Sequence, residues 1–293
     1  MSQKVEGKRT AMAMAAARAV GAKHADPKVR NPDYLAEYFL PFPYRPLVTF
    51  KLGRALMMQI FQREARGIYF HQQSRTPHID ALLLAELGAG TEQVVILGAG
   101  FDSRAHRLAQ ALAGRPVFEV DHPGTQAWKR DRLVRLPAGV AQAVVYVPID
   151  FNRERLEDAL SKAGLDLGKK TFFLMEGVIM YLMPEAVERT LAFIRRSSRG
   201  SSVVFDYIYK GILDGTADYY GAKETIRAIA SSDEPYLWGL MPTEVGAFLA
   251  ERGLELVSDV GPAELTARYL ISSEGRSIGR QSEFLSVAHA RVR

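Results

Sequence analysis

A glycine turn followed by an acidic residue is the clearest chemical signal in the sequence. The apolar run at 94–97 leads directly into a turn between Gly98 and Gly100, and Asp121 stands 21 residues later, just after the next apolar run. Glycines at such a turn let a ligand lie against the backbone, and free amides at the start of the following helix bind anions. An acid at this distance is placed to hold ribose hydroxyls. The pattern predicts a site for an adenosine-containing ligand with a charged tail.

Two cofactors share the adenosine half that this turn would hold. The dinucleotide fingerprint G-x-G-x-x-G needs a third small residue for close packing of helix on strand, and Ser103 occupies that position. Nicotinamide dinucleotides and S-adenosylmethionine both fit the pattern at this point. A tight turn that binds no ligand is a further interpretation of G-x-G alone, and the presence of Asp121 argues against it.

Acidic residues also follow two further apolar runs. Asp150 comes after the run at 144–149, and Glu176 after the run at 172–175. Because the carboxyl ends of strands in an open α/β sheet form its ligand crevice, these acids and Asp121 are expected to meet there. Phe151 supplies a flat apolar surface beside the acceptor Asp150, which suits an adenine ring and its amino group.

Short apolar runs separated by helical patterns predict the sheet that positions these residues. Seven runs span residues 94–97, 117–120, 144–149, 172–175, 202–206, 255–260 and 283–290. Strands that alternate with helices are typical of a doubly wound parallel α/β sheet, in which the last two strands are candidates for antiparallel neighbours. Residues 105–112 show apolar positions at i, i+3, i+4 and i+7 and predict one helix, and Pro184 suits the first turn of another.

The chain divides into two predicted regions. Residues 1–90 contain helical patterns and proline punctuation without an alternating strand, which indicates an N-terminal helical cap, and residues 91–293 form the α/β domain. Residues 207–240 interrupt the strand rhythm with glycines and scattered aromatic side chains. We expect this insertion to lie as a lid over the carboxyl edge of the sheet.

Composition narrows the classes of function. The 293 residues are 47% hydrophobic with a net charge of +5, and no cysteine is present, which excludes thiol catalysis and thiolate metal sites. The basic residues are scattered, which favours small anionic ligands over nucleic acid. No apolar run reaches eighteen residues, and residues 10–22 have the composition of an ordinary helix rather than a signal peptide. We therefore expect a cytoplasmic protein with no nucleic-acid or membrane partner.

Three motifs in this order resemble the leucine carboxyl methyltransferase family and its bacterial branch of S-adenosylmethionine-dependent O-methyltransferases, which includes polyketide-tailoring enzymes. They are LGAGFDSR at 97–104, EVDHP at 119–123 with Trp128 and Lys129 following, and EGVIMYL at 176–182. Residues 10–19 and 74–76 resemble the N-terminal part of the family, so the similarity covers most of the chain. It implies a seven-stranded, Rossmann-like class I methyltransferase sheet with a helical cap, and S-adenosylmethionine as the methyl donor.

The resemblance also implies roles for individual residues. Arg75 would pair with the methionine carboxylate and Glu176 would contact the same end of the cofactor, while Asp121 would hold the ribose. Asp150 and Phe151 would flank the adenine. Together with the two glycines of the turn, the implied cofactor-binding positions are Arg75, Gly98, Gly100, Asp121, Asp150, Phe151 and Glu176.

The implied reaction is a direct in-line displacement at the sulfonium methyl by a carboxylate or hydroxyl oxygen of a small molecule. Such a reaction needs a dry, aligned pocket and no metal. A carboxylate acceptor is already ionised, whereas a phenol would benefit from a base. Tyr181 is the first candidate to position the acceptor. Further acceptor-side candidates are Tyr207, Tyr209, Trp238 and Arg45.

Alternative functions stay open on the sequence alone. An NAD(P)-dependent oxidoreductase would use the same adenosine half-site, but Ser103 and the acidic Glu176 disfavour a second nucleotide. A non-catalytic S-adenosylmethionine-binding protein would keep the turn and close the acceptor pocket. We expect Arg104 and Arg107 to brace a strand-end carboxylate such as Glu119 rather than to act in catalysis.

Overall fold

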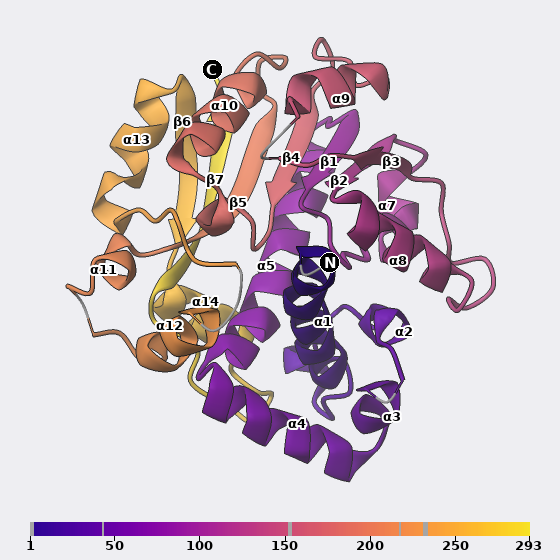
Figure 1. Ribbon diagram of the computed structural model, residues 1–293, viewed down its shortest axis with the longest axis vertical. Coiled ribbons are helices and arrows are strands. Elements are labelled where there is room, and N and C mark those ends of the chain that lie inside the picture. The colour runs from indigo at the N-terminus through magenta and orange to yellow at the C-terminus, as the bar shows by residue number, and fades with distance from the viewer. Residues whose placement is uncertain (1–2, 43, 152–153, 217, 231–233) are drawn as a thin grey trace.

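A seven-stranded sheet forms the centre of the computed structural model, which describes residues 3–42, 44–151, 154–216, 218–230 and 234–293. The strand order is β3-β2-β1-β4-β5-β7-β6 (Figure 1). All neighbouring strands are parallel except β7, which runs antiparallel to both β5 and β6. The strands are β1 (Gln93–Leu97), β2 (Val117–Asp121), β3 (Val145–Pro148), β4 (Thr171–Met175), β5 (Ser202–Ile208), β6 (Leu254–Val260) and β7 (Leu285–Val292).

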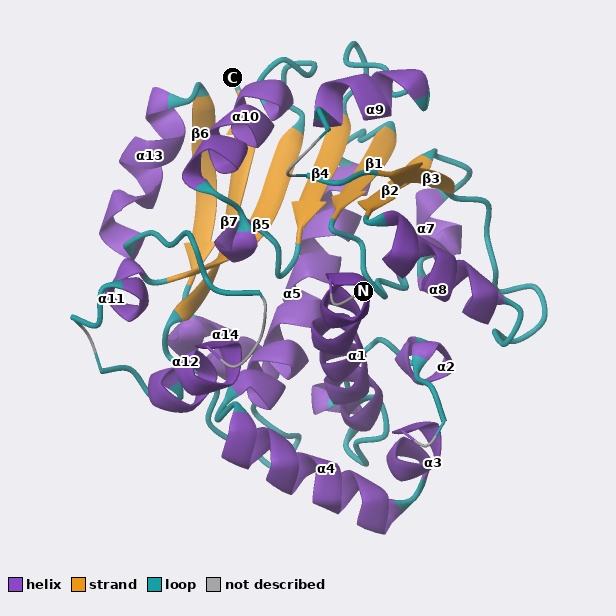
Figure 2. Cartoon of the chain, viewed as in Figure 1, coloured by secondary structure: helices purple, strands orange, loops and turns teal. Residues whose placement is uncertain are grey.

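The central strands are mostly apolar because helices cover both faces of the sheet (Figure 2). Successive side chains of β1 point to opposite faces, so Val95 and Leu97 join one apolar cluster while Val94 and Ile96 join another. The first cluster includes side chains of α9 (Leu156–Lys162), α10 (Pro184–Ile194) and α13 (Val245–Glu251). The second includes side chains of α5 (Ile68–Gly88), α6 (Arg104–Arg107), α7 (Ala109–Leu112) and α14 (Pro262–Tyr269). The predicted α/β class, seven strands and antiparallel final pair are confirmed.

The N-terminal region is helical over its described residues, as predicted. It contains α1 (Gln3–Gly21), η1 (Pro27–Val29), α2 (Ala36–Phe39), α3 (Tyr44–Thr49), α4 (Lys51–Glu64) and the long helix α5. Residues of α1 to α5 build an apolar cluster around Leu35 and Phe39. The second half of α5 packs Ile79, Leu83 and Leu87 on the sheet, so this one helix fixes the N-terminal helices to the α/β layers.

The remaining elements connect the strands. They are α8 (Pro123–Leu133), η2 (Ile179–Tyr181), α11 (Lys210–Leu213), α12 (Ala222–Ala230) and η3 (Pro242–Glu244). Pro184 lies in the first turn of α10, as expected. Within the described part of the chain, no helix combines the length and the apolarity that a membrane crossing would require.

Two predicted boundaries differ from the structure. The expected helix over 105–112 is two short helices, α6 and α7, which meet at Leu108. Strand β5 continues to Ile208 because Tyr207 and Ile208 extend its fully buried run, so the insertion begins at residue 209 rather than 207. The side chain of Tyr207 therefore belongs to the sheet.

Candidate functional site

A cavity of about 630 Å³ lies at the carboxyl ends of β1, β2, β3 and β4. The strand ends and α5 form one side, which we call the sheet wall. The opposite side, the lid wall, consists of Thr10, Ala11 and Met14 of α1 together with Glu234, Pro235 and Leu237. All eight predicted site residues line this one cavity: Arg75, Gly98, Gly100, Asp121, Asp150, Phe151, Glu176 and Tyr181.

The glycine turn after β1 takes a conformation that favours glycine. Gly98 and Gly100 have φ angles of +61° and +46°. A Cβ atom on Gly98 would lie 2.4 Å from Cγ2 of Val178, so a side chain there would force the turn away from the loop that follows β4. Because these two residues have no side chains, the backbone of the turn is open to the cavity.

Asp121 is fixed against this turn. Its Oδ2 accepts a hydrogen bond of 2.5 Å from the amide of Gly100, and its Oδ1 accepts one of 2.5 Å from the amide of His122. Burial raises the pKa of Asp121, although both of these bonds favour the ionised form. Each carboxylate oxygen has capacity for a second donor, so ligand hydroxyls can bind to it without displacing the backbone.

Helix α5 presents polar side chains toward the sheet wall. Gln72, Thr76 and Asp80 are four residues apart and Arg75 lies three residues after Gln72, so these side chains lie on the same side of the helix. All four side chains are buried, like most residues of this helix. Because α5 also packs on the sheet, it holds Arg75 at the strand ends although β4 begins only at Thr171, far along the sequence.

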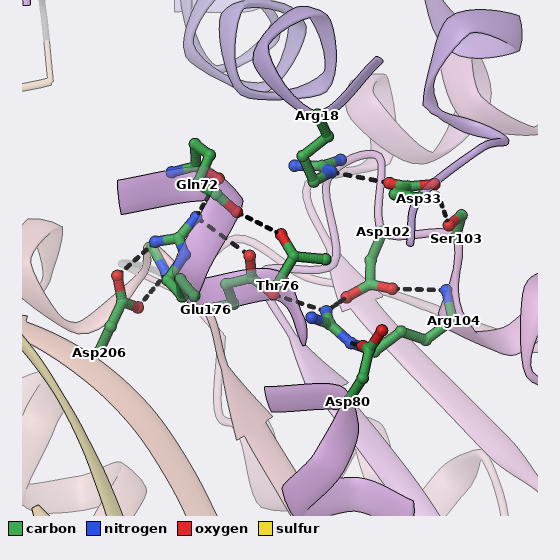
Figure 3. A network of polar contacts seen from close by, with 12 residues as sticks. Arg18, Asp33, Gln72, Thr76, Asp80, Asp102, Ser103, Arg104, Glu176 and Asp206 are labelled. Carbon is green, nitrogen blue, oxygen red and sulfur yellow. Dashed lines mark hydrogen bonds and ion pairs between the residues drawn. The ribbon is translucent and has the colours of Figure 1, made fainter. Parts of the chain in front are cut away.

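The carboxylate of Glu176 lies between Arg75 and Arg104. Figure 3 shows Glu176 and Arg104 within the surrounding network of polar contacts. Nη2 of Arg75 lies 3.1 Å from Oε1 of Glu176, and Nη1 of Arg104 donates to Oε2 at 2.5 Å. Arg75 also donates to Asp206 at the end of β5, whose other oxygen accepts a 2.5 Å bond from the amide of Gly177. The strand-end acids of β4 and β5 are thus joined through Arg75.

The network extends along the sheet wall through further ion pairs. Arg104 donates to Asp102 and, at 2.7 Å, to Asp80, which also accepts from Arg107 at 2.6 Å. Arg18 pairs with Asp33 at 2.7 Å. Four arginines therefore face five carboxylates, and the network carries one excess negative charge. Its members are Arg18, Arg75, Arg104, Arg107, Asp33, Asp80, Asp102, Glu176 and Asp206.

The arginines keep the buried acids ionised. Burial alone would raise the pKa of Glu176, but the neighbouring Arg104 and Arg75 outweigh it and hold that pKa well below its usual range. In the same way, Arg75 lowers the pKa of Asp206 against the effect of complete burial. The sheet wall is therefore charged and fixed before any ligand enters.

Two donors of this network have no acceptor among the described residues. Nε of Arg75 and Nη2 of Arg104 are buried, and neither makes a hydrogen bond. Both residues line the cavity. A buried donor without an acceptor is costly, so a ligand that brings an anionic oxygen to these nitrogens would remove that cost. The carboxylate of an amino acid fits this requirement.

The structure corrects the expected role of the arginines after the glycine turn. Glu119, their expected partner, is paired instead with Lys129, whose Nζ lies 2.6 Å away. Arg104 contacts Glu176, Asp80 and Asp102, so it braces a strand-end carboxylate, but a different one. Arg104 is thus a site residue that the sequence interpretation set aside.

Asp206 is a second site residue that the sequence interpretation missed. It lies near the carboxyl end of β5 and its side chain is inaccessible to solvent. The signal was present in the sequence, because Asp206 ends the apolar run at 202–206 just as Asp121 and Glu176 end or follow theirs. Applying the strand-end argument to this run would have found it.

The adenine-side candidates follow β3 directly. Asp150 and Phe151 both line the cavity, and the amide of Ile149 donates to the backbone oxygen of Asp121 at 2.9 Å, which holds this segment beside β2. Phe151 is half-buried and packs on the larger apolar cluster. The flat side chain and the carboxylate thus lie at the same end of the cavity as Asp121.

Among the acceptor-side candidates, only Tyr181 belongs to the described cavity lining. Its ring lies 5.3 Å from that of Tyr236, and burial raises its pKa well above the usual range. The hydroxyl of Tyr207 donates to Asp259 at 2.9 Å, and that of Tyr209 lies 2.8 Å from Oγ of Ser286, so both point into the β5–β7–β6 side of the sheet.

Trp238 and Arg45 also lie away from the cavity. Trp238 packs on Phe248, with ring centroids 5.4 Å apart, and Arg45 lies 4.8 Å above the ring of Tyr38.

The lid wall is held by a hydrogen bond of 2.7 Å from Thr10 to Glu234, which joins α1 to the segment after α12. This bond brings the N-terminal helix and the insertion together over the sheet edge.

Comparison with known proteins identifies the family. A family model described as leucine carboxyl methyltransferase matches residues 11–195. A protein of Mycolicibacterium gilvum (strain PYR-GCK) named "Putative S-adenosyl-L-methionine-dependent methyltransferase" is 34% identical over 219 residues, which cover 73% of this chain and 68% of the relative. A protein of the same name from Mycobacteroides abscessus is 32% identical over 284 residues, covering 88% of this chain and 86% of the relative.

A solved structure has the same fold. A DUF574 family protein from Streptomyces avermitilis MA-4680 matches with a TM-score of 0.58 at 17% sequence identity, covering 82% of this chain and 91% of that chain. The motifs around Gly98, Asp121 and Glu176, which carried the resemblance, all lie within the residues that the family model matches. The chain belongs to the leucine carboxyl methyltransferase family.

Proposed function

We propose that the protein is an S-adenosylmethionine-dependent O-methyltransferase that transfers a methyl group to a carboxylate or hydroxyl oxygen of a small molecule. The observation that carries this proposal is the single cavity in which the Gly98–Gly100 turn, Asp121 and the Arg75–Glu176–Arg104 cluster meet. Family membership and the names of the relatives support the methyl donor.

The cavity offers a partner for each part of the donor. Asp121 would hold the ribose hydroxyls, and Asp150 with Phe151 would flank the adenine. Arg75 and Arg104 would bind the carboxylate through their unoccupied buried donors. Glu176, held between the two arginines, would lie beside the ammonium group.

Charge favours the same ligand. The arginine–carboxylate network has one excess negative charge, and Asp121 and Glu234 add carboxylates to the lining of the cavity. S-adenosylmethionine carries one net positive charge at neutral pH, so it complements this lining. The pyrophosphate of a nicotinamide dinucleotide would meet these carboxylates, which disfavours the oxidoreductase alternative.

The methyl donor, when bound, supplies an electrophilic methyl group on a sulfonium. The protein's part is to hold the donor rigidly at the sheet wall and to keep water out. The ion pairs of Arg75 and Arg104 fix the sheet wall, while the hydrogen bond of Thr10 to Glu234 closes the opposite side. The displacement itself needs no metal ion.

The acceptor would bind between the donor and the lid wall. Tyr181 would position it, because its ring lines the cavity and Tyr236 packs against it. A carboxylate acceptor would need no base. A hydroxyl acceptor would need one, and Glu234 is the carboxylate of this wall that is suited to take the proton.

The experiment that tests the proposal uses S-adenosylmethionine labelled with tritium in the methyl group and matched pairs of aromatic acids and phenols. Transfer of label into an organic product supports the proposal. Alkali then separates the two acceptor types, because methyl esters are hydrolysed to methanol whereas aryl methyl ethers are not. Binding of the donor without transfer to any acceptor in EDTA-treated or untreated protein would indicate a non-catalytic binding protein instead.

A further inference from the structure

Half of the large apolar side chains that the described chain exposes lie in one short segment. Seven of the fourteen are between residues 34 and 60, and the other seven are scattered over the rest of the described residues. Leu52 and Phe42 are 86% and 84% exposed. The segment contributes Tyr34, Phe42, Tyr44, Phe50, Leu52, Leu56 and Ile60.

Helix α4 displays part of this set as a stripe. Leu52, Leu56 and Ile60 are four residues apart and therefore share one face of the helix, which we call the α4 stripe. The face beside the stripe is fixed to the protein: Met57 is buried, and a Cβ on Gly53 would lie 2.3 Å from the backbone oxygen of Leu47 in α3. Helix α4 lies at the end of the molecule remote from the sheet (Figure 1). The stripe is thus presented to solvent by a firmly packed helix.

Positive charge accompanies the stripe. Residues 42–66 contain five basic side chains and one acidic side chain, Glu64, so they hold four of the five net positive charges of the whole chain. Arg66 pairs at 3.3 Å with Glu224 of α12, which leaves a local excess of three. Lys51 and Arg63 stand at the two ends of the stripe. The basic side chains are Arg45, Lys51, Arg54, Arg63 and Arg66.

We propose that the α4 stripe binds the surface of a membrane that contains anionic lipids. Its apolar side chains would enter the boundary between headgroups and acyl chains, and Lys51 and Arg63 would contact the anionic headgroups. Membrane crossing requires a long apolar helix, whereas surface binding requires only a helix with an apolar face and basic flanks. This inference is independent of the proposed methyl transfer, and it departs from the expectation, drawn from the sequence, that the protein has no membrane partner.

The positive charge around the α4 stripe favours an anionic membrane over a second copy of the chain as its binding partner. In a two-fold dimer the same surface meets itself, so the basic side chains around the stripe would be brought together. Nucleic acid would complement the charge but not the apolar stripe. An anionic lipid surface complements both features.

Sedimentation with phospholipid vesicles tests this proposal. Wild-type protein is expected to bind vesicles of phosphatidylcholine with one quarter phosphatidylglycerol about tenfold more strongly than pure phosphatidylcholine, and to lose this preference at high salt. Replacing the stripe by glutamine (Leu52→Gln, Leu56→Gln, Ile60→Gln) is expected to weaken binding by about tenfold or more, because apolar insertion is lost. The charge variant Lys51→Gln/Arg63→Gln is expected to weaken binding to anionic vesicles only.

A matched control replaces three exposed apolar residues elsewhere, Leu84, Val134 and Val257, by glutamine and is expected to bind vesicles like the wild type. Circular dichroism verifies that all variants fold. Equal vesicle binding by the stripe variant and the wild type would overturn the proposal, as would no binding at all. Self-association that depends on the stripe, measured by sedimentation velocity, would show that the stripe is a dimer interface instead. Binding to polyglutamate but not to vesicles would show that its partner is an acidic protein.

Discussion

The two walls of the cavity are built in different ways. The sheet wall consists of strand-end acids and arginines whose charges are paired and buried, and Arg75 and Arg104 each contact more than one carboxylate. In the lid wall, Thr10 donates a hydrogen bond to Glu234, and the other members are apolar: Ala11, Met14, Pro235 and Leu237. The sheet wall is suited to hold one fixed ligand, and the lid wall to adapt to another.

The family comparison covers most of the sheet wall, although Asp206 lies beyond the matched residues and Ala11 and Met14 of the lid wall lie within them. The family model matches residues 11–195, which include every predicted cofactor-binding residue, whereas Glu234, Pro235 and Leu237 lie beyond it. The buried ion pairs of the sheet wall join the site to the fold, whereas most members of the lid wall are apolar. Changes to the sheet wall should therefore affect stability and donor binding together, and changes to the lid wall should affect neither strongly.

The largest effect is expected for Glu176→Ala. This substitution leaves Arg75 and Arg104 with fewer anionic partners in a buried site, so unfolding free energy should fall by about 3–5 kcal/mol and donor binding should be lost. Urea titration and calorimetry measure the two effects. Glu234→Ala on the lid wall is the matched control, and it should lower the unfolding free energy by about 1 kcal/mol or less. An equal cost for both variants would remove the distinction between the walls.

The pH dependence of stability offers a second measure of the sheet wall. The arginines hold the pKa of Glu176 below its unfolded value of 4.5. The contribution of Glu176 to the unfolding free energy is therefore complete above pH 4.5 and is lost as the pH falls toward the folded pKa. The difference in unfolding free energy between the wild type and Glu176→Gln should therefore be constant between pH 6 and 8 and shrink below about pH 4.5. A difference that grew on acidification would contradict this assignment.

Gly98→Ala tests the turn itself. The φ of +61° and the 2.4 Å approach to Val178 should together cost about 2 kcal/mol of unfolding free energy and weaken donor binding. Combining it with Val178→Ala removes the steric contact but keeps the strained φ, so about half of the cost should return. Complete recovery in the double variant would show that the backbone conformation contributes nothing.

Asp121→Asn should weaken binding of S-adenosylmethionine about tenfold, because the neutral amide is a poorer acceptor for ribose hydroxyls. Its oxygen can still accept one of the two backbone bonds that Asp121 accepts now, so stability should change less than in Glu176→Ala. Calorimetric titration gives the ratio of dissociation constants. An unchanged constant would exclude Asp121 from the donor site.

The smallest effect is expected for Tyr181→Phe. The ring and its packing on Tyr236 remain, so unfolding free energy should fall by about 1 kcal/mol or less and donor affinity should stay within about threefold of wild type. Once an acceptor is found, its KM should rise more than the KM of the donor. A loss of donor affinity as large as that of Asp121→Asn would place Tyr181 on the sheet wall.

Local patterns were sufficient to predict the strands and most strand-end residues. The runs of the central strands appeared as mostly apolar segments because both sheet faces are covered, and the acids Asp121, Asp150 and Glu176 line the cavity. Boundaries were less accurate, since the apolar pattern gave no sign of the break at Leu108 or of the extension of β5 to Ile208. These depend on packing rather than on local preference.

Partners in the ion-pair network could not be predicted in the same way. Arg104 was expected to meet Glu119, but α8 places Lys129 beside Glu119 and leaves Arg104 with Glu176, which is 72 residues away. Which arginine meets which acid depends on how α5 and α6 dock on the sheet. The lid wall was least predictable, because Tyr207 and Tyr209 look suitable by type and yet point into the sheet.

Calorimetric titration of the wild-type protein with S-adenosylmethionine and, separately, with NAD⁺ tests the central claim most directly. A cavity whose carboxylates outnumber its arginines, with two buried arginine nitrogens that have no acceptor among the described residues, should bind the sulfonium nucleoside with one-to-one stoichiometry and give no saturable heat with the dinucleotide. Tight binding of NAD⁺ without any response to S-adenosylmethionine would contradict it.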